Sequence, residues 1–244
     1  MYNPSRRAFL AKGAVATGGI LAGAALAGCG SGTATVAAST TTTFPHVTNG
    51  ADGLARLVAG NNRFVSGNPT NQGRTSARQV ELVDTQAPFA IILGCSDSRV
   101  SPEIVFDQGI GDLFVVRVAG NTAVDPILLG SIEYSIEVLG SVLLMVLGHE
   151  NCGAVKSALS EVQKGTTFPG DIGNLLGPIV PAAQSVGTLP AASQLDGAIK
   201  QNVLNQVQLL GASSAIIQPA VAAGKLKIVG AEYTLGTGKV TILT

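Results

Sequence analysis

The 244-residue sequence is poor in metal-binding, aromatic and charged side chains. It has three cysteines, two histidines and no tryptophan, and aromatic residues make up 4% of it. Fifteen basic residues balance fifteen acidic ones, and the basic residues form no cluster outside the N-terminal segment. A neutral chain without a basic patch has little attraction for a phosphate backbone. We therefore expect no nucleic acid among its partners.

The N-terminal apolar run is too short to span a membrane as a helix. Residues 14–28 are rich in alanine and glycine, and about 20 apolar residues are needed for a span. The run follows the twin arginine of SRRAFL and ends in Leu-Ala-Gly-Cys at Cys29. We interpret residues 1–28 as a twin-arginine (Tat) signal peptide. Its end resembles the lipobox of bacterial lipoproteins, in which the cysteine becomes lipidated.

This interpretation predicts an exported protein at the cell surface or in the periplasm, anchored to the membrane through lipidated Cys29. The alternative is a plain secretory signal whose cleavage region contains a cysteine by chance. Residues 29–48 are rich in serine and threonine and have no apolar face, so they predict a flexible tether. Residues 49–244 are then long enough for one folded domain with a sizeable core.

Apolar runs and helical periodicity alternate along this domain. The strands are expected at 89–93, 113–118, 142–147 and 226–229. The helices are expected at 52–67, 76–84, 126–139, 154–164, 171–186 and 193–210. Residues 231–243 contain a glycine-rich turn and predict a terminal pair of strands. The pattern indicates an α/β fold with a mostly parallel central sheet flanked by helices.

Soft metal ligands stand where two of the predicted strands end. Cys95 closes FAIILGC, His149 closes VLLMVLGH, and Cys152 follows in HENC. Ligands gather at the carboxyl ends of parallel strands, so these side chains can meet despite their separation in sequence. An imidazole and two thiolates suit Zn²⁺ and leave a fourth position for water. The alternative, ordinary in an exported chain, is a disulfide between the cysteines.

Asp97 and Arg99 lie two and four residues after Cys95. A guanidinium can hold a carboxylate with two parallel hydrogen bonds and keep it ionised as an acceptor beside the metal. An ordinary structural ion pair at a turn is the alternative. Zinc lowers the pKa of bound water to about 7, so the predicted site would supply a nucleophile at neutral pH.

Four motifs carry a resemblance to a known family. In order and with similar spacing, CSDSRV, GDLFVVRVAGN, LGHENCGAV and GAEYTLGTGKV resemble the beta-class carbonic anhydrases, and LVAGNNRF resembles their N-terminal pattern. The resemblance covers about residues 54–243. It implies reversible hydration of carbon dioxide to bicarbonate and a proton by a zinc-bound hydroxide, with one Zn²⁺ per subunit. It also implies Cys95, His149 and Cys152 as zinc ligands and Asp97 with Arg99 as the catalytic pair.

The resemblance implies a substrate pocket and an oligomer as well. Gln86, Phe114, Ala119 and Tyr134 correspond to positions that contact substrate, and the backbone of Gly153 corresponds to a hydrogen-bond donor. Phe114, Ala119 and Tyr134 lie in apolar segments and are equally consistent with an ordinary core. Beta-class members are dimers or larger assemblies with sites at the subunit interface. A homodimer or higher homo-oligomer is therefore expected, in which Gln86 serves a neighbouring subunit.

Three positions depart from the common family pattern, and alternatives to the proposed activity remain. Val118 stands where many members have asparagine, Glu150 replaces a small hydroxyl residue, and Ala119 replaces a bulkier valine. In some members the aspartate equivalent to Asp97 binds zinc directly and closes the site. The same scaffold could instead hydrolyse carbon disulfide or carbonyl sulfide, or it could be a zinc-binding lipoprotein without turnover.

Overall fold

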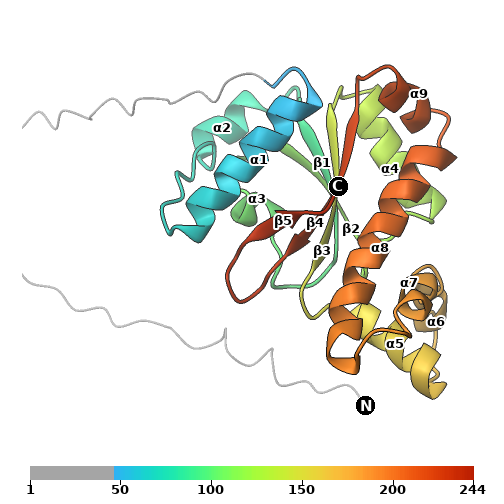
Figure 1. Cartoon of the computed structure of the whole chain (residues 1–244). Coiled ribbons are helices and arrows are strands. Elements are labelled where there is room, and N and C mark those ends of the chain that lie inside the picture. The colour runs from blue at the N-terminus through green and yellow to red at the C-terminus, as the bar shows by residue number, and fades with distance from the viewer. Residues whose placement is uncertain (1–46) are drawn as a thin grey trace, which may run out of the picture. The chain divides into compact units, whose positions relative to one another are not determined.

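The computed structural model describes residues 47–244, which form a five-stranded sheet with helices on both faces (Figure 1). The strand order is β2-β1-β3-β4-β5. β1, β2, β3 and β4 are parallel, and β5 runs antiparallel to β4. This confirms the predicted α/β fold with a mostly parallel sheet. The predicted signal peptide, Cys29 and nearly all of the predicted tether lie outside the described residues.

The strands form where the apolar runs predict them. β1 (Ala90–Gly94) and β3 (Leu143–His149) are buried along their whole length, as expected of strands covered on both faces. β2 (Leu113–Arg117) lies at one edge of the sheet. β4 (Lys227–Tyr233) joins two segments that the sequence predicts separately, and it pairs with β5 (Val240–Ile242) across the glycine-containing turn.

The helices lie in groups around the sheet. α1 (Gly50–Val65), α2 (Ser76–Glu81) and α3 (Pro102–Val105) lie on one side, and α4 (Pro126–Glu137), α8 (Ala191–Ser213) and α9 (Ile217–Ala222) lie on the other (Figure 1). α5 (Gly153–Lys164), α6 (Ile172–Leu176) and α7 (Val180–Ser185) pack near the lower part of α8. Within the described residues, no helix is both long and apolar enough to cross a membrane.

Two features of the helices differ from the prediction. The single helix expected at 171–186 is broken into α6 and α7, because Gly177 and Pro178 interrupt it and proline lacks the N–H that a helix interior needs. The short helices α3 and α9 were not predicted. Their four and six residues are too few to show a helical apolar period.

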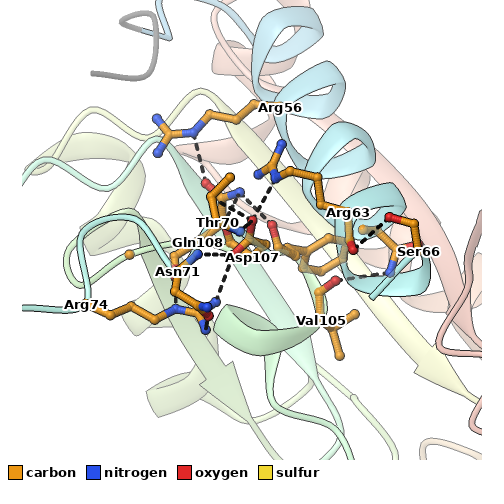
Figure 2. Close-up of polar contacts among 12 residues, drawn as sticks. Arg56, Arg63, Ser66, Thr70, Asn71, Arg74, Val105, Asp107 and Gln108 are labelled. Atoms are coloured by element: carbon orange, nitrogen blue, oxygen red, sulfur yellow. Dashed lines mark hydrogen bonds and ion pairs between the residues drawn. The ribbon is translucent and has the colours of Figure 1, made fainter. Parts of the chain in front are cut away.

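A buried carboxylate, Asp107, fastens α1 and the segment after it to the turn that follows α3. The side chain is 0% exposed and accepts hydrogen bonds from Arg63 Nε at 2.7 Å, Thr70 N at 2.9 Å, Thr70 Oγ1 at 2.8 Å and Asn71 N at 3.0 Å. Arg74 Nη2 lies 3.5 Å away. Figure 2 shows these groups arranged around Asp107. We call this set the Asp107 hub.

The hub explains how a buried charge is tolerated here. A buried carboxylate is stable only when it is paired and its lone pairs are filled, and the four residues around Asp107 meet both conditions. Burial by itself raises the pKa of Asp107, but the hydrogen bonds from Arg63, Thr70 and Asn71 outweigh it, so the pKa of this carboxyl is lowered. The hub therefore favours the ionised form.

We predict that Asp107→Asn lowers the free energy of unfolding by roughly 3 kcal/mol at pH 7, because it replaces the buried carboxylate that pairs with Arg63 by a neutral amide. A carboxyl with a lowered pKa stabilises the fold above its unfolded-state pKa of about 3.9, and this contribution is lost as the pH falls through the lower native value. The stability difference between wild type and variant should thus narrow below about pH 4.

Urea unfolding followed by circular dichroism between pH 7 and pH 3 measures both quantities. Asp84→Asn is the matched control, since Asp84 is exposed in the loop after α2 and its removal should change stability by less than about 0.5 kcal/mol. A difference in the free energy of unfolding between wild type and Asp107→Asn that stayed constant from pH 7 to pH 3 would contradict an ionised Asp107 in the folded protein.

Candidate metal centre

Three potential metal ligands converge at the carboxyl ends of two neighbouring strands. Cys95 follows β1, His149 is the last residue of β3, and Cys152 is the N-cap of α5. One ligand atom from each lies within 4.8 Å of the others, and all three residues are buried. β1 and β3 flank the point where the strand order reverses, which is where parallel α/β sheets bind ligands.

The ring of His149 is oriented for metal binding. Its Nδ1 lies 2.8 Å from the backbone oxygen of Glu150. A carbonyl oxygen can only accept, so Nδ1 carries the hydrogen and the lone pair is on Nε2. Nε2 is buried and has no hydrogen-bond partner among the described residues. A histidine that ligates a metal usually donates the N–H of its other ring nitrogen to a carbonyl, as His149 does here.

The two cysteines are free and form no disulfide with one another. A hydrogen bond from Cys152 lowers the pKa of Cys95 to about 4, against the opposing effect of burial, and donating that hydrogen bond raises the pKa of Cys152. Gly120 N also donates to Cys95 Sγ at 3.3 Å. Cys152 lies at the N-terminus of the twelve-residue α5, where the helix dipole favours a thiolate.

The charge on this pair also acts on the imidazole. Burial lowers the pKa of His149, but the adjacent Cys95 thiolate, the hydrogen bond to the backbone oxygen of Glu150 and the charge of Asp97 together raise it.

The donor set and its spacing fit Zn²⁺. Bond lengths of about 2.3 Å to sulfur and 2.0 Å to nitrogen place the ligand atoms of a tetrahedral zinc roughly 3.5–3.8 Å apart. The three ligand atoms here lie within 4.8 Å of one another, so small side-chain adjustments suffice. Three protein donors leave one coordination position for water or substrate, which is typical of catalytic zinc.

Asp97 and Arg99 form the predicted ion pair beside the cluster. Arg99 donates from Nη2 to Asp97 Oδ2 at 2.7 Å and from both Nε and the backbone N to Oδ1 at 2.9 Å. These hydrogen bonds hold the pKa of Asp97 well below its usual range, although burial opposes them. Asp97 Oδ2 lies 3.8 Å from His149 Nε2. An ionised acceptor therefore stands next to the metal ligands while Arg99 occupies both of its oxygens.

Arg117 is a site residue to which the sequence analysis assigned no role. Its Nε donates to the backbone oxygen of Cys95 at 2.8 Å and its Nη2 donates to that of Asp97 at 2.5 Å. Arg117 is the last residue of β2 and pairs in register with Gly94. It thus fixes the loop that carries both a metal ligand and the acidic residue. A guanidinium at the end of an apolar strand was the available signal.

The predicted substrate residues lie in different surroundings. Ala119 is half-buried next to Gly120, and Gly153 is the exposed first residue of α5, whose N–H has no partner within the helix. Gln86 is exposed in the loop before β1, Phe114 is half-buried on β2, and Tyr134 on α4 is 49% exposed. None of these last three makes a hydrogen bond to the cluster within the described chain.

The structure also places two of the positions that depart from the family pattern. Glu150 is half-buried, and its Oε2 accepts from Gly236 N at 3.4 Å in the turn between β4 and β5. Its carboxylate therefore faces that turn. Val118 contributes its backbone, because its N donates to Gly94 O at 3.1 Å and its O accepts from Ser96 N at 3.3 Å.

Comparison with known proteins gives a consistent picture. A family model described as carbonic anhydrase matches residues 90–240. The chain is 40% identical over 195 residues to carbonic anhydrase 2 of Mycobacterium tuberculosis, which covers 80% of this chain and 93% of that protein.

Two solved structures share the fold. The Coccomyxa beta-carbonic anhydrase in complex with acetazolamide is 28% identical, with a TM-score of 0.60 over 79% of this chain and 82% of that one. A tetrameric beta-carbonic anhydrase from Sordaria macrospora is 22% identical, with a TM-score of 0.63 over 79% and 97% of the two chains.

Proposed function

This chain belongs to the beta-class carbonic anhydrases, zinc enzymes that interconvert carbon dioxide with bicarbonate and a proton, and we propose that Cys95, His149 and Cys152 hold its zinc. The observation that carries the assignment is the buried convergence of two thiols with an imidazole nitrogen that has no other partner among the described residues. When bound there, zinc supplies the Lewis acidity that lowers the pKa of a coordinated water to about 7.

We assign the orientation of the nucleophile to Asp97. Its Oδ2 lies 3.8 Å from His149 Nε2, so this carboxylate stands beside the residues that would hold the zinc. Because Arg99 keeps the carboxylate ionised, Oδ2 can accept a hydrogen bond, and it would orient the nucleophile toward the carbon of carbon dioxide. Arg99 also prevents free rotation of the carboxylate, since it engages both oxygens.

We propose that the unpaired N–H of Gly153 donates to a substrate oxygen and that Ala119 borders the pocket. Gln86, Phe114 and Tyr134 complete the site of a neighbouring subunit, because each is at least partly exposed and none is bonded to the cluster of its own chain. A site built in this way requires an oligomer.

The prediction for turnover is that Asp97→Ala lowers the rate of carbon dioxide hydration by at least about 100-fold while the zinc content stays at one per chain, because the ligands are untouched. Stopped-flow hydration with a pH indicator gives the rate, and plasma emission spectrometry gives the zinc content. Asp171→Ala is the control, since Asp171 is exposed and lies nineteen residues after Cys152. Wild-type turnover no faster than buffer would refute the proposed function, and full activity of Asp97→Ala would refute the role of Asp97.

We infer that the subunits associate through the face around β2 and α4. β2 lies at an edge of the sheet with backbone groups available for pairing, and Ile127 and Val138 on α4 are 80% and 61% exposed. Exposed apolar side chains beside an open strand edge are typical of an interface. Tyr134 lies on the same helix. The Sordaria macrospora structure is described as tetrameric, which supports an oligomer for this chain.

Ile127→Glu should therefore shift the protein toward monomer and reduce turnover at the same time, because each site loses the residues of its neighbour. Light scattering coupled to size exclusion measures the mass, and the hydration assay measures turnover. Val162→Glu places the same charge on α5, where the side chain is 38% exposed, and should change neither. An Ile127→Glu protein with the wild-type mass would contradict the interface.

We propose that the enzyme is exported and anchored to the membrane. The twin arginine, the short apolar run and the Leu-Ala-Gly-Cys sequence ending at Cys29 support this proposal. An acyl anchor and a tether of residues 29–48 would hold the catalytic domain close to the membrane surface.

In cells that carry out Tat export and lipoprotein processing, full-length protein should partition into the detergent phase, whereas Cys29→Ser should stay in the aqueous phase. Arg6→Lys with Arg7→Lys should leave the protein uncleaved in the cytoplasm. Phase separation in Triton X-114 with immunoblotting measures the partitioning of wild type and Cys29→Ser. Cell fractionation shows whether the double arginine variant stays in the cytoplasm. Equal partitioning of wild type and Cys29→Ser would rule out the anchor.

A further inference from the structure

The loop after β2, residues 118–123, supplies the hydrogen bond that reaches the sulfur of Cys95. Gly120 N donates to Cys95 Sγ at 3.3 Å. Gly120 has a φ of +80°, and a Cβ there would lie 2.3 Å from Ile179 Cδ1, so only glycine fits. The next residue, Asn121, also has a positive φ of 48°. Asn121 has a side chain in this left-handed region, so the loop needs external contacts to hold its conformation.

Two buried amides of α8 make those contacts. Asn202 Nδ2 donates to the backbone oxygen of Gly120 at 2.8 Å, and Gln206 Oε1 accepts from Ala123 N at 3.0 Å. Asn202 and Gln206 are 1% and 2% exposed and lie four residues apart, so they share one face of the helix. The chemistry fixes both amide orientations, because a carbonyl can only accept and a backbone N–H can only donate.

The close approach of α8 to the sheet depends on two glycines. A Cβ at Gly148 on β3 would lie 2.6 Å from Val203 Cγ2, and a Cβ at Gly230 on β4 would lie 2.8 Å from Val203 Cγ1. Val203 follows Asn202 on α8 and is fully buried against these two strands. The glycines therefore let α8 settle deeply enough for its amides to reach the 118–123 loop. Gly148 also precedes the ligand His149 directly.

We propose that Asn202 and Gln206 are positioning residues for the metal centre, which hold the 118–123 loop so that Gly120 N–H donates to the Cys95 thiolate. Neither side chain touches the ligands themselves. Their effect passes through one backbone hydrogen bond to a sulfur, and such outer contacts tune the electron density that a ligand gives to its metal. The inference rests on the proposed function, because it takes Cys95 as a zinc ligand.

The test replaces each amide by the acid of the same shape and reads the metal spectroscopically. At position 202 the amide must donate, so Asn202→Asp loses the contact with Gly120 when the acid is ionised, and Asn202→Ala, which has no donor, loses it at any pH. At position 206 the amide must accept, so Gln206→Glu keeps the contact with Ala123 and Gln206→Met loses it. Each protein is loaded with Co²⁺, and the thiolate-to-cobalt charge-transfer absorption is recorded beside the thermal unfolding midpoint.

We expect the charge-transfer band of Asn202→Asp and Gln206→Met to move to longer wavelength, because a thiolate without its hydrogen bond holds its electrons less tightly. Zinc affinity from chelator competition should fall by about tenfold or more in the same two variants. Gln206→Glu should keep the wild-type band. Asn205→Asp is the matched control on α8, since the Asn205 side chain accepts a hydrogen bond from Gln201 in the same helix.

The outcomes separate the inference from the proposed function. Wild-type protein without a thiolate-to-cobalt band would refute the zinc site itself. A normal wild-type band that does not move in Asn202→Asp, even if the unfolding midpoint drops, would overturn the positioning role and leave a purely structural one. Equal shifts in Asn202→Asp and Asn205→Asp would also overturn it. Asn202→Ala gives the same reading should the buried acid prevent folding.

Discussion

The burial of two cysteine sulfurs beside an imidazole is the constraint on which the rest of the structure depends. A negative sulfur inside a protein is stable only with donors or a cation close by. The chain places Gly120 N–H against Cys95 and the N-terminus of α5 against Cys152. These contacts only partly offset the charge, and a divalent cation completes the balance. The fold thus favours zinc, because the protein by itself already places negative sulfur charge at the site.

The register of the sheet carries this constraint to the catalytic pair. Because Gly94 pairs with Arg117 across parallel strands, the guanidinium reaches the carbonyls of Cys95 and Asp97. A shift of one residue would turn Arg117 to the other face of the sheet. The loop would then lose the tie that keeps Asp97 3.8 Å from His149. The position of the carboxylate is therefore a property of the pairing between β1 and β2 as much as of Arg99.

How much of this could be predicted from sequence depended on the range of each interaction. β1 and β3 are continuous apolar runs with ligands at their ends, so local pattern and the rule for parallel sheets sufficed for the fold and for the meeting of Cys95 with His149. The sequence period shows that residues 202 and 206 share a helix face but not which loop they meet. That contact depends on how deeply α8 packs, which only the three-dimensional structure reveals.

The site is built on loops and yet is braced from both faces of the sheet. On one side α8 holds the 118–123 loop through two buried amides. On the other side the segment that leaves Cys95 runs through α3 directly into Asp107, which the hub fastens to α1. The first brace contacts Gly120, next to Ala119, and the second ends at Asp107, eight residues after Arg99. Rigid helices acting on short loops therefore provide the preorganisation that a metal site needs, and a loosened brace should alter the site before it unfolds the domain.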